Sequence, residues 1–413
     1  MSQNLPIVNV FLLEYTSVVG LPVNRECVRF TLIMMKGNDL PGEVLCRVGA
    51  NLLEEDNVRD RMLHRREWLK LTLASAASAG RAAPPAAAAR YETPYKYGRL
   101  VLSASAETNA FDSRAVDCPF VFWHKGLYYM LFVGFDGRGY QTGLACSRNL
   151  TEWKKLGCIL RRNPSSAITR YNVAMNWILR ENELRSRGRL KKVDGRFLGV
   201  FHAYPEPGYE SGPAVIGLCW GRSLKEWEIG EVILRPEDGA EWEQGGLYKP
   251  CLLEHKGTYY LFYNAKTRKL PREQGGGWRE QIGVATSRDL KHWTRYPGNP
   301  IIGNGPAGSW DGRFASDPCV LLDGELWVFF YYGLDRKGVA RDLIAVSRDP
   351  YHPEKLDKIL IDVGPPGSVD STYAHKPSIV WHKDALYHFY CAVSGRWPYE
   401  VRGISVARSR PWD

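Results

Sequence analysis

The sequence lacks three features that would place it in a common class: a cysteine framework, a long apolar run and clustered basic residues. Its nine cysteines are an odd number, lie mostly inside apolar segments and show no zinc-site spacing. They predict small buried side chains rather than disulfides or a metal site. The formal net charge is +10, but the basic residues are scattered along the chain. We therefore expect no nucleic-acid partner.

Residues 62–80 read MLHRREWLKLTLASAASAG, with a basic start, a modest apolar run and then small residues. The apolar run is far shorter than the roughly 20 residues that cross a bilayer, so this order indicates a secretory signal rather than a membrane anchor. The pair Arg65 and Arg66 resembles a twin-arginine export signal. We expect export to the periplasm or the extracellular space, with no membrane attachment of the mature protein.

This signal divides the chain into three parts. Residues 1–61 are an N-terminal extension, either a mis-assigned stretch before a true start at Met62 or a separate small element. Residues 62–90 hold the signal and an Ala/Pro linker, and residues 91–413 form the folded domain. With 44% hydrophobic and 12% aromatic residues, the chain has ample material for a large core.

One pattern of short strands occurs five times after residue 116. Each copy has an apolar strand that begins near a proline in most copies, then a strand rich in Tyr, Phe and Trp, then a strand that in most copies ends in Ser-Arg or a variant of it. The openings are DCPFVFW from Asp117, a degenerate NWILR from Asn176, KPCLLE from Lys249, DPCVLL from Asp317 and HKPSIVW from His375; the endings are GLACSRNLTEW from Gly143, GLCWGRSLKEW from Gly217, GVATSRDLKHW from Gly283, IAVSRD from Ile344 and ISVARS from Ile404. Such short units bury their faces only by stacking on one another. The repeat therefore predicts an all-β fold, a five-bladed β-propeller of four-stranded antiparallel blades.

A regular offset aligns four of the copies. An aromatic or apolar residue followed by an acid precedes each proline by the same distance, in the pairs Phe111–Asp112, Trp242–Glu243, Trp310–Asp311 and Val369–Asp370. This recurrence predicts a shared structural role for the acids. The same alignment makes Arg114 and Arg313 equivalent to each other.

The first residues of the innermost propeller strands face one shared funnel. These positions carry polar side chains that packing does not require, namely Asp117, Asn176 or a neighbour, Lys249, Asp317, His375 and Lys376. The constellation predicts a site for a polar ligand. Glycosidic bond hydrolysis needs two groups that flank the bond, and Asp117 with Asp317 would supply part of that machinery. The alternative is that each Asp before a proline caps its own turn.

The DCP and DP strand starts, the YYMLF strand and the SR[ND]LxxW endings resemble those of the five-bladed propeller glycoside hydrolases. These include arabinanases and xylosidases of family 43, the related fructosidases, neoagaro-oligosaccharide hydrolases of family 117 and mannoside-active enzymes of family 130. The resemblance covers about residues 100–413. For arabinanase-like members it implies a first-blade Asp base, matched by Asp117, and a third-blade Glu acid, where Lys249 stands instead. For family 117 it implies an Asp, a later Asp and a His acid, an order matched by Asp117, Asp317 and His375.

Histidine suits the acid role because its pKa near 6.5 would be raised by a neighbouring carboxylate. If His375 is structural, the acid must come from Glu206 or Glu210, in the loop that follows His202, or from Glu243. Four basic residues, Lys249, Lys376, Arg114 and Arg313, make the funnel wall attractive to an anionic sugar or to phosphate, unless they pair internally. Loop aromatics would stack on sugar rings or simply pack: Trp177, Tyr204, Tyr209, Trp278 and Trp397.

Together these features predict a glycoside hydrolase that acts on plant or algal oligo- and polysaccharides and inverts the anomeric centre. Asp117 is the predicted base, Asp317 the orienting carboxylate, and His375 or a loop glutamate such as Glu206 the acid. Two alternatives stay open: a phosphate-dependent glycoside phosphorylase and a non-catalytic carbohydrate-binding propeller. No cofactor is required, although the carboxylates would admit a divalent cation on the axis.

Overall fold

The computed structural model describes residues 31–34, 42–45, 88–274, 276–396 and 399–412. The chain divides into two units, Met1–Arg81 and Ala82–Asp413. In the first unit, β1 (Thr31–Met34) pairs antiparallel with β2 (Gly42–Leu45). The predicted export signal at residues 62–80, the start at Met62 and the side chain of Trp397 lie outside the described residues. Over the described ranges, no helix is both long and apolar enough to cross a membrane.

The second unit consists of antiparallel strand groups with short 3-10 turns between them. The first group is β4 (Ala115–His124), β5 (Leu127–Phe135), β6 (Tyr140–Ser147) and β7 (Lys154–Leu160); the second is β8 (Ala174–Ile178), β10 (Arg196–Ala203), β11 (Val215–Gly221) and β12 (Trp227–Leu234), with β9 (Lys192–Val193) beside β10; the third is β13 (Gly246–His255), β14 (Thr258–Lys266), β15 (Glu280–Ser287) and β16 (Thr294–Arg295); the fourth is β17 (Phe314–Asp323), β18 (Leu326–Leu334), β19 (Ala340–Ser347) and β20 (Glu354–Ile361); the last is β21 (Tyr373–His382), β22 (Ala385–Ser394), β23 (Val401–Arg408) and β3 (Tyr95–Lys96). The 3-10 turns are η2 (Ala89–Tyr91), η3 (Pro236–Asp238), η4 (Glu241–Glu243) and η5 (Arg272–Gln274).

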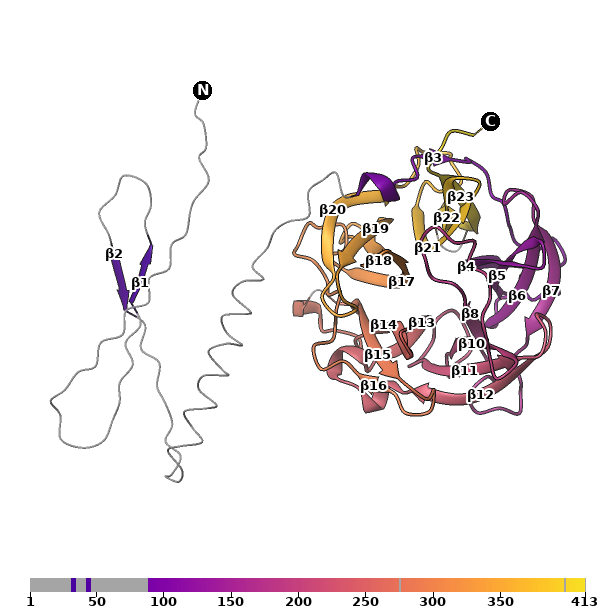
Figure 1. The fold of residues 1–413 in the computed structure, drawn as a ribbon, viewed down its shortest axis with the longest axis horizontal. Coiled ribbons are helices and arrows are strands. Elements are labelled where there is room, and N and C mark those ends of the chain that lie inside the picture. Colours follow the sequence, from indigo (N-terminus) through magenta and orange to yellow (C-terminus); the bar gives the residue numbers. More distant parts are fainter. Residues whose placement is uncertain (1–30, 35–41, 46–87, 275, 397–398, 413) are drawn as a thin grey trace. The chain divides into compact units, whose positions relative to one another are not determined.

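The prediction of an all-β fold built from antiparallel hairpins is confirmed. Figure 1 shows the groups arranged around a common centre, with β4, β8, β13, β17 and β21 nearest to it. The last three groups form one continuous sheet, because short parallel bridges join β15 to β17 and β19 to β21. The division into five separate blades therefore stays a prediction. The N-terminal β3 pairs with β23, so the two ends of this unit complete one group.

The repeated acids have the structural role that the alignment predicts. Each acid is buried and forms an ion pair with a lysine or arginine near or on the outermost strand of its group. The pairs are Asp112–Lys155, Glu243–Arg295, Asp311–Lys355 and Asp370–Lys96. In three groups a tyrosine hydroxyl from the second strand also donates to the acid: Tyr263, Tyr331 and Tyr390. The acids thus tie the outer part of each group to its middle, and Glu243 is part of the scaffold.

The innermost strands share a strained backbone position just before the proline. Cys118, Lys249, Asp317 and Lys376 have φ values of 52°, 48°, 53° and 69°, in the left-handed region that non-glycine residues rarely adopt. Each coincides with a register shift in its hairpin, and such bulges redirect side chains. Strain of this kind costs of order 1–3 kcal/mol per residue and is concentrated at functional sites.

Residues 180–190, here called the crossing segment, contact three of the innermost strands. The backbone N–H of Leu322 donates to Asn182, that of Trp123 to Gly188 and that of Trp381 to Ser186, so the segment contacts the ends of β17, β4 and β21. Its charged side chains are largely exposed, but Arg180 is 1% exposed. The Arg180 guanidinium donates to the carbonyls of Val121, on β4, and Ile379, on β21.

Candidate active site

A narrow pocket of about 10 Å³ lies at the opposite end of the innermost strands, where the strained pre-proline positions meet. Its lining residues are Asp117, Cys118, Val133, Tyr140, His202, Glu210, Tyr248, Lys249, Asp317, Tyr332 and Lys376. All four pre-proline residues line it, because the bulge turns each of these side chains toward the centre. The structure thus brings together six residues that the sequence singled out: Asp117, His202, Glu210, Lys249, Asp317 and Lys376.

Asp117 is an anion held by several donors. Its Oδ2 accepts from Lys376 Nζ at 2.8 Å, Arg402 Nη1 at 3.1 Å and the Tyr209 hydroxyl at 3.2 Å, and its Oδ1 accepts the backbone N–H of Cys118 at 2.7 Å. Burial favours the neutral acid, but the charges of Lys376 and Arg402 outweigh it and hold the pKa of Asp117 well below its usual value. Asp117 is therefore ionised at any pH near neutral.

Asp317 has the opposite electrostatic environment. It is 2% exposed, and burial raises its pKa to about 7 although Lys376 and Lys249 act against the shift. Its Oδ1 accepts from Ser316 Oγ at 3.1 Å, and no ion pair reaches this carboxyl among the described residues. Asp317 therefore keeps its proton under mildly acidic to neutral conditions.

Glu210 supplies a third carboxyl to the pocket from the loop between β10 and β11. Burial raises its pKa above the ordinary value for glutamate. Its contacts are weak, since the Tyr140 hydroxyl lies 3.4 Å and Lys376 Nζ 3.9 Å from its Oε1. The loop backbone is fixed on both sides of Glu210, because Lys266 Nζ donates to the Glu210 carbonyl and Gly208 N–H donates to Arg138.

His202 and His375 are both neutral. His375 does not line the pocket; its Nδ1 bonds the Cys391 carbonyl at 3.2 Å. The neighbouring carboxylate of Asp117 acts to raise its pKa, as expected, but the net shift is downward. Burial, with the charges of Lys376 and Arg402, outweighs Asp117 and lowers the pKa well below 6.5. The pKa of His202 is likewise lowered, mainly by burial. Neither imidazole holds a second proton at neutral pH.

The other predicted site residues lie outside the pocket lining. Glu206 is exposed, and its backbone carbonyl accepts from Asn172. Trp177 packs against Phe120 with ring centroids 4.5 Å apart. The remaining positions are exposed Arg114, half-buried Arg313 beside Phe314 and Trp278, and Asn176, which is 1% exposed. Their predicted roles stay predictions.

Sequence reasoning missed several residues of the site. Arg402 was not recognised, although it stands at the repeat position where the other copies have Thr142, Ile216, Ile282 and Asp342. That departure from the common pattern was the available signal. Tyr140, Tyr248 and Tyr332 gave no such signal, because aromatic residues fill many core positions of the same strands.

Within the described ranges, no group of three or more His, Cys, Asp or Glu side chains is placed to hold a metal ion. In the pocket, the carboxylate of Asp117 is neutralised by Lys376 and Arg402 instead. The described residues therefore offer no group of ligands for the predicted axial divalent cation.

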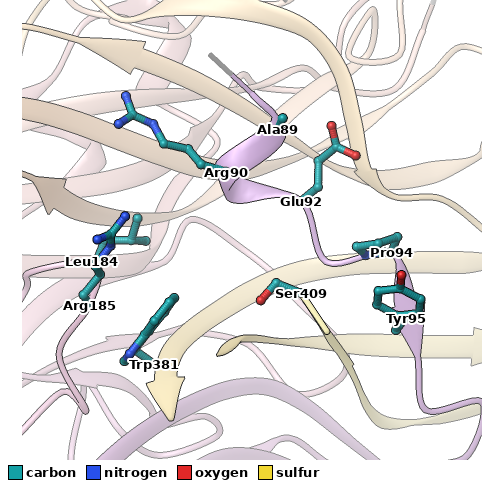
Figure 2. Close-up of a pocket in the computed structure, with 9 residues that line it drawn as sticks. All are labelled: Ala89, Arg90, Glu92, Pro94, Tyr95, Leu184, Arg185, Trp381 and Ser409. Atoms are coloured by element: carbon teal, nitrogen blue, oxygen red, sulfur yellow. The ribbon is translucent and has the colours of Figure 1, made fainter. Parts of the chain in front are cut away.

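A second pocket, of about 330 Å³, lies between the crossing segment and the stretch from Ala89 to Tyr95 (Figure 2). Its charged side chains have partners in the protein. Arg90 pairs with Asp323 at 3.2 Å and Glu92 with Lys358 at 2.9 Å, while Arg185 lies over the ring of Trp381. The pocket around Asp117 and Asp317, which holds the Tyr248 hydroxyl without a hydrogen-bond partner, is the candidate active site.

Comparison with known proteins agrees with this fold. No family model matches the chain. A 1,2-β-oligomannan phosphorylase of Thermoanaerobacter sp. (strain X514) is 23% identical over 164 residues, which are 38% of this chain and 46% of that protein. The chain thus matches less than half the length of this curated relative.

Among solved structures, a complex of BT0996 with RGII is 29% identical, with a TM-score of 0.68 over 79% of this protein and 94% of the other. A glycoside hydrolase is 26% identical, with a TM-score of 0.66 over 86% and 97% of the two proteins. Zg3597, a family 117 glycoside hydrolase of Zobellia galactanivorans, shares the fold at 15% identity, with a TM-score of 0.54 over 77% and 91% of the two proteins.

The predicted resemblance to propeller glycoside hydrolases of families 117 and 130 is therefore confirmed for the fold. The chain is related to glycoside hydrolases and to a glycoside phosphorylase, which supports a carbohydrate-processing enzyme.

Proposed function

We propose that this protein is a five-bladed propeller glycosidase that hydrolyses glycosidic bonds in plant or algal oligosaccharides. One observation carries the proposal: Asp117 and Asp317 line one pocket, and their pKa values are displaced in opposite directions. Two carboxyls whose environments separate their pKa values can act as a proton donor and an anion at the same pH, which is what glycoside cleavage requires.

In this mechanism Asp317 is the general acid. Its proton passes to the glycosidic oxygen as the bond from that oxygen to the anomeric carbon breaks, so that the leaving sugar departs as a neutral alcohol. A pKa of about 7 supports this role, since the proton is present below that pH and is readily transferred.

Glu210 is the proposed base. It takes one proton from the water whose oxygen bonds to the anomeric carbon, which returns the carboxyl pair to one proton in total. Asp117 is less suited to this step than the sequence suggests, because three donors engage its Oδ2. Asp117 instead holds Lys376 in the pocket, where the Lys376 charge acts to lower the pKa of Glu210 and so favours the ionised base. With water as the attacking group, we expect inversion at the anomeric centre.

A glycoside phosphorylase is the second candidate. Two observations favour it, the partial match to an oligomannan phosphorylase and the two lysines that line the pocket. Phosphate would then replace water as the attacking group, and no base would be needed.

One assay separates the candidates. Purified protein is incubated with a panel of nitrophenyl glycosides and natural oligosaccharides, with and without inorganic phosphate, and the first product is followed by proton NMR. Phosphate-independent release of an inverted sugar supports the hydrolase. Release that requires phosphate supports the phosphorylase, and binding without turnover would contradict both.

A further inference from the structure

One wall of the pocket presents hydrogen-bond donors that have no acceptor. It consists of His202, Tyr248 and Lys249, here called the donor wall, and all three residues line the pocket. Lys249 is 6% exposed, and among the described residues no acceptor or carboxylate lies within bonding distance of its Nζ. A buried ammonium without a partner is unfavourable by several kcal/mol unless a ligand or water compensates it.

The other two cations at the site are neutralised within the protein. Lys376 Nζ lies 2.8 Å from Asp117, and Arg402 bonds both Asp117 and Glu400, the latter at 3.0 Å. Glu210 adds a third carboxyl, which lies 3.9 Å from Lys376 Nζ. Lys249 differs from Lys376 and Arg402, because among the described residues no carboxylate lies within ion-pair distance of it, so its ammonium can pair with a negative charge on a ligand.

The neighbours of Lys249 add two neutral donors. The Tyr248 hydroxyl is buried without a hydrogen-bond partner, and burial raises its pKa, so it keeps its proton. The backbone N–H of Lys249 donates to His202 Nδ1 at 3.3 Å, which places the proton of this neutral imidazole on Nε2. A carboxylate matches this wall, because its two oxygens accept about four hydrogen bonds.

We propose that the donor wall binds the carboxylate of an acidic sugar, so that the substrate presents the carboxylate of a uronate residue to this pocket. The inference rests on the proposed function for the identity of the ligand as a sugar. It assigns Lys249 a role in specificity rather than in bond cleavage.

Isothermal titration calorimetry tests the proposal without any need for turnover. The ligands are methyl glycosides of glucuronate, galacturonate and mannuronate, each compared with its neutral hexose counterpart, and inorganic phosphate. At least one uronate should bind about 10- to 100-fold more tightly than its neutral counterpart, as expected for hydrogen bonds to a charged group. Lys249→Met should abolish this preference. Lys191→Met, which removes a partly exposed lysine paired with Glu254, should retain it.

Three results would overturn the proposal: equal affinity of the wild-type protein for acidic and neutral glycosides, a preference that survives Lys249→Met, or phosphate as the only anion bound. If Lys249→Met does not fold, the affinities of the wild-type protein for each uronate and its neutral counterpart still test the predicted preference for acidic glycosides. Cleavage of neutral glycosides without any uronate preference would contradict this inference alone. Uronate binding without cleavage of any glycoside would contradict the proposed function alone.

Discussion

Lys376 Nζ lies 2.8 Å from Asp117 Oδ2, although 259 positions separate the two residues in the sequence. The pair joins the first innermost strand to the last, and both side chains are less than a tenth exposed. This ion pair favours the ionised form of Asp117, and Lys376 Nζ also lies 3.9 Å from Glu210 Oε1. The same ion pair therefore links the first innermost strand to the last and sets the electrostatics of the pocket.

Replacing Lys376 by Met should destabilise the fold, because Asp117 then remains as a buried charge with Arg402 as its remaining cation. We expect a loss of about 3 kcal/mol in the free energy of unfolding, at the lower end of the range for broken buried pairs. Urea denaturation measures it, with Lys191→Met as the partly exposed control. In the double variant Asp117→Asn/Lys376→Met much of the stability should return, and strict additivity of the two losses would contradict the pairing.

Asp317→Asn should stabilise the protein at high pH more than at low pH. Well below pH 3.8 the Asp317 carboxyl is protonated in both the folded and the unfolded state. Between the ordinary pKa of 3.8 and the folded pKa of about 7, the unfolded chain ionises first, so Asp317 lowers stability progressively as pH rises. Thermal melts at pH 5 and pH 8 should show a larger gain for the variant at pH 8; an equal gain at both values would contradict the raised pKa.

The pH dependence of turnover should follow the same group. If Asp317 is the acid, kcat/KM should decline as pH rises through about 7, with the slope expected when a single group loses its proton. The charge of Lys249 lowers the pKa of Asp317, so Lys249→Met should move this decline to higher pH. A decline that stays at the same pH in the variant would assign it to another group.

Glu210 and Glu206 form a matched pair for testing the loop. Glu210→Gln should lower kcat by about 10²- to 10⁴-fold, because it removes the proposed base. Glu206→Gln changes the same residue type in the same loop at an exposed position and should leave kcat within about twofold. Steady-state kinetics on the best substrate of the panel measures both, and equal effects would show that the loop rather than the Glu210 carboxyl matters.

Arg180→Met should destabilise the fold without touching the pocket. The change leaves the buried carbonyls of Val121 and Ile379 without their donor, and each such loss costs about 1–3 kcal/mol. Arg187→Met, an exposed change in the same segment, should alter stability by about 0.5 kcal/mol or less. Chemical denaturation measures the stability of both variants. An equally large loss in Arg187→Met would indicate that the net charge of the crossing segment, rather than the Arg180 hydrogen bonds, determines stability.

Much of the scaffold could be predicted from the sequence, because the same structural requirement recurs in several copies of the repeat. The antiparallel hairpins and the buried acids such as Asp311 follow from recurring letters at fixed offsets. The meeting of Asp117, Lys249, Asp317 and Lys376 in one pocket follows from their place at the start of innermost strands.

The electrostatics could not be predicted in this way. Asp117 and Asp317 look alike in sequence, yet the first lies beside two cations and the second beside none within ion-pair distance among the described residues. The proline alignment also places them one position apart, since Asp317 corresponds to Cys118. His375 has the opposite pKa shift from the one expected, because its degree of burial depends on Tyr332 and Tyr373 packed against it.

The left-handed backbone before each proline has a consequence for how such a site changes over time. The same local geometry presents a thiol, an ammonium, a carboxyl and a second ammonium in four parts of one molecule, so the backbone tolerates different chemistry at that point. New specificities can then arise by exchanging single side chains at these four positions while the surrounding sheets stay as they are. The positions Cys118, Lys249, Asp317 and Lys376 are accordingly where we would begin a library aimed at altered substrates.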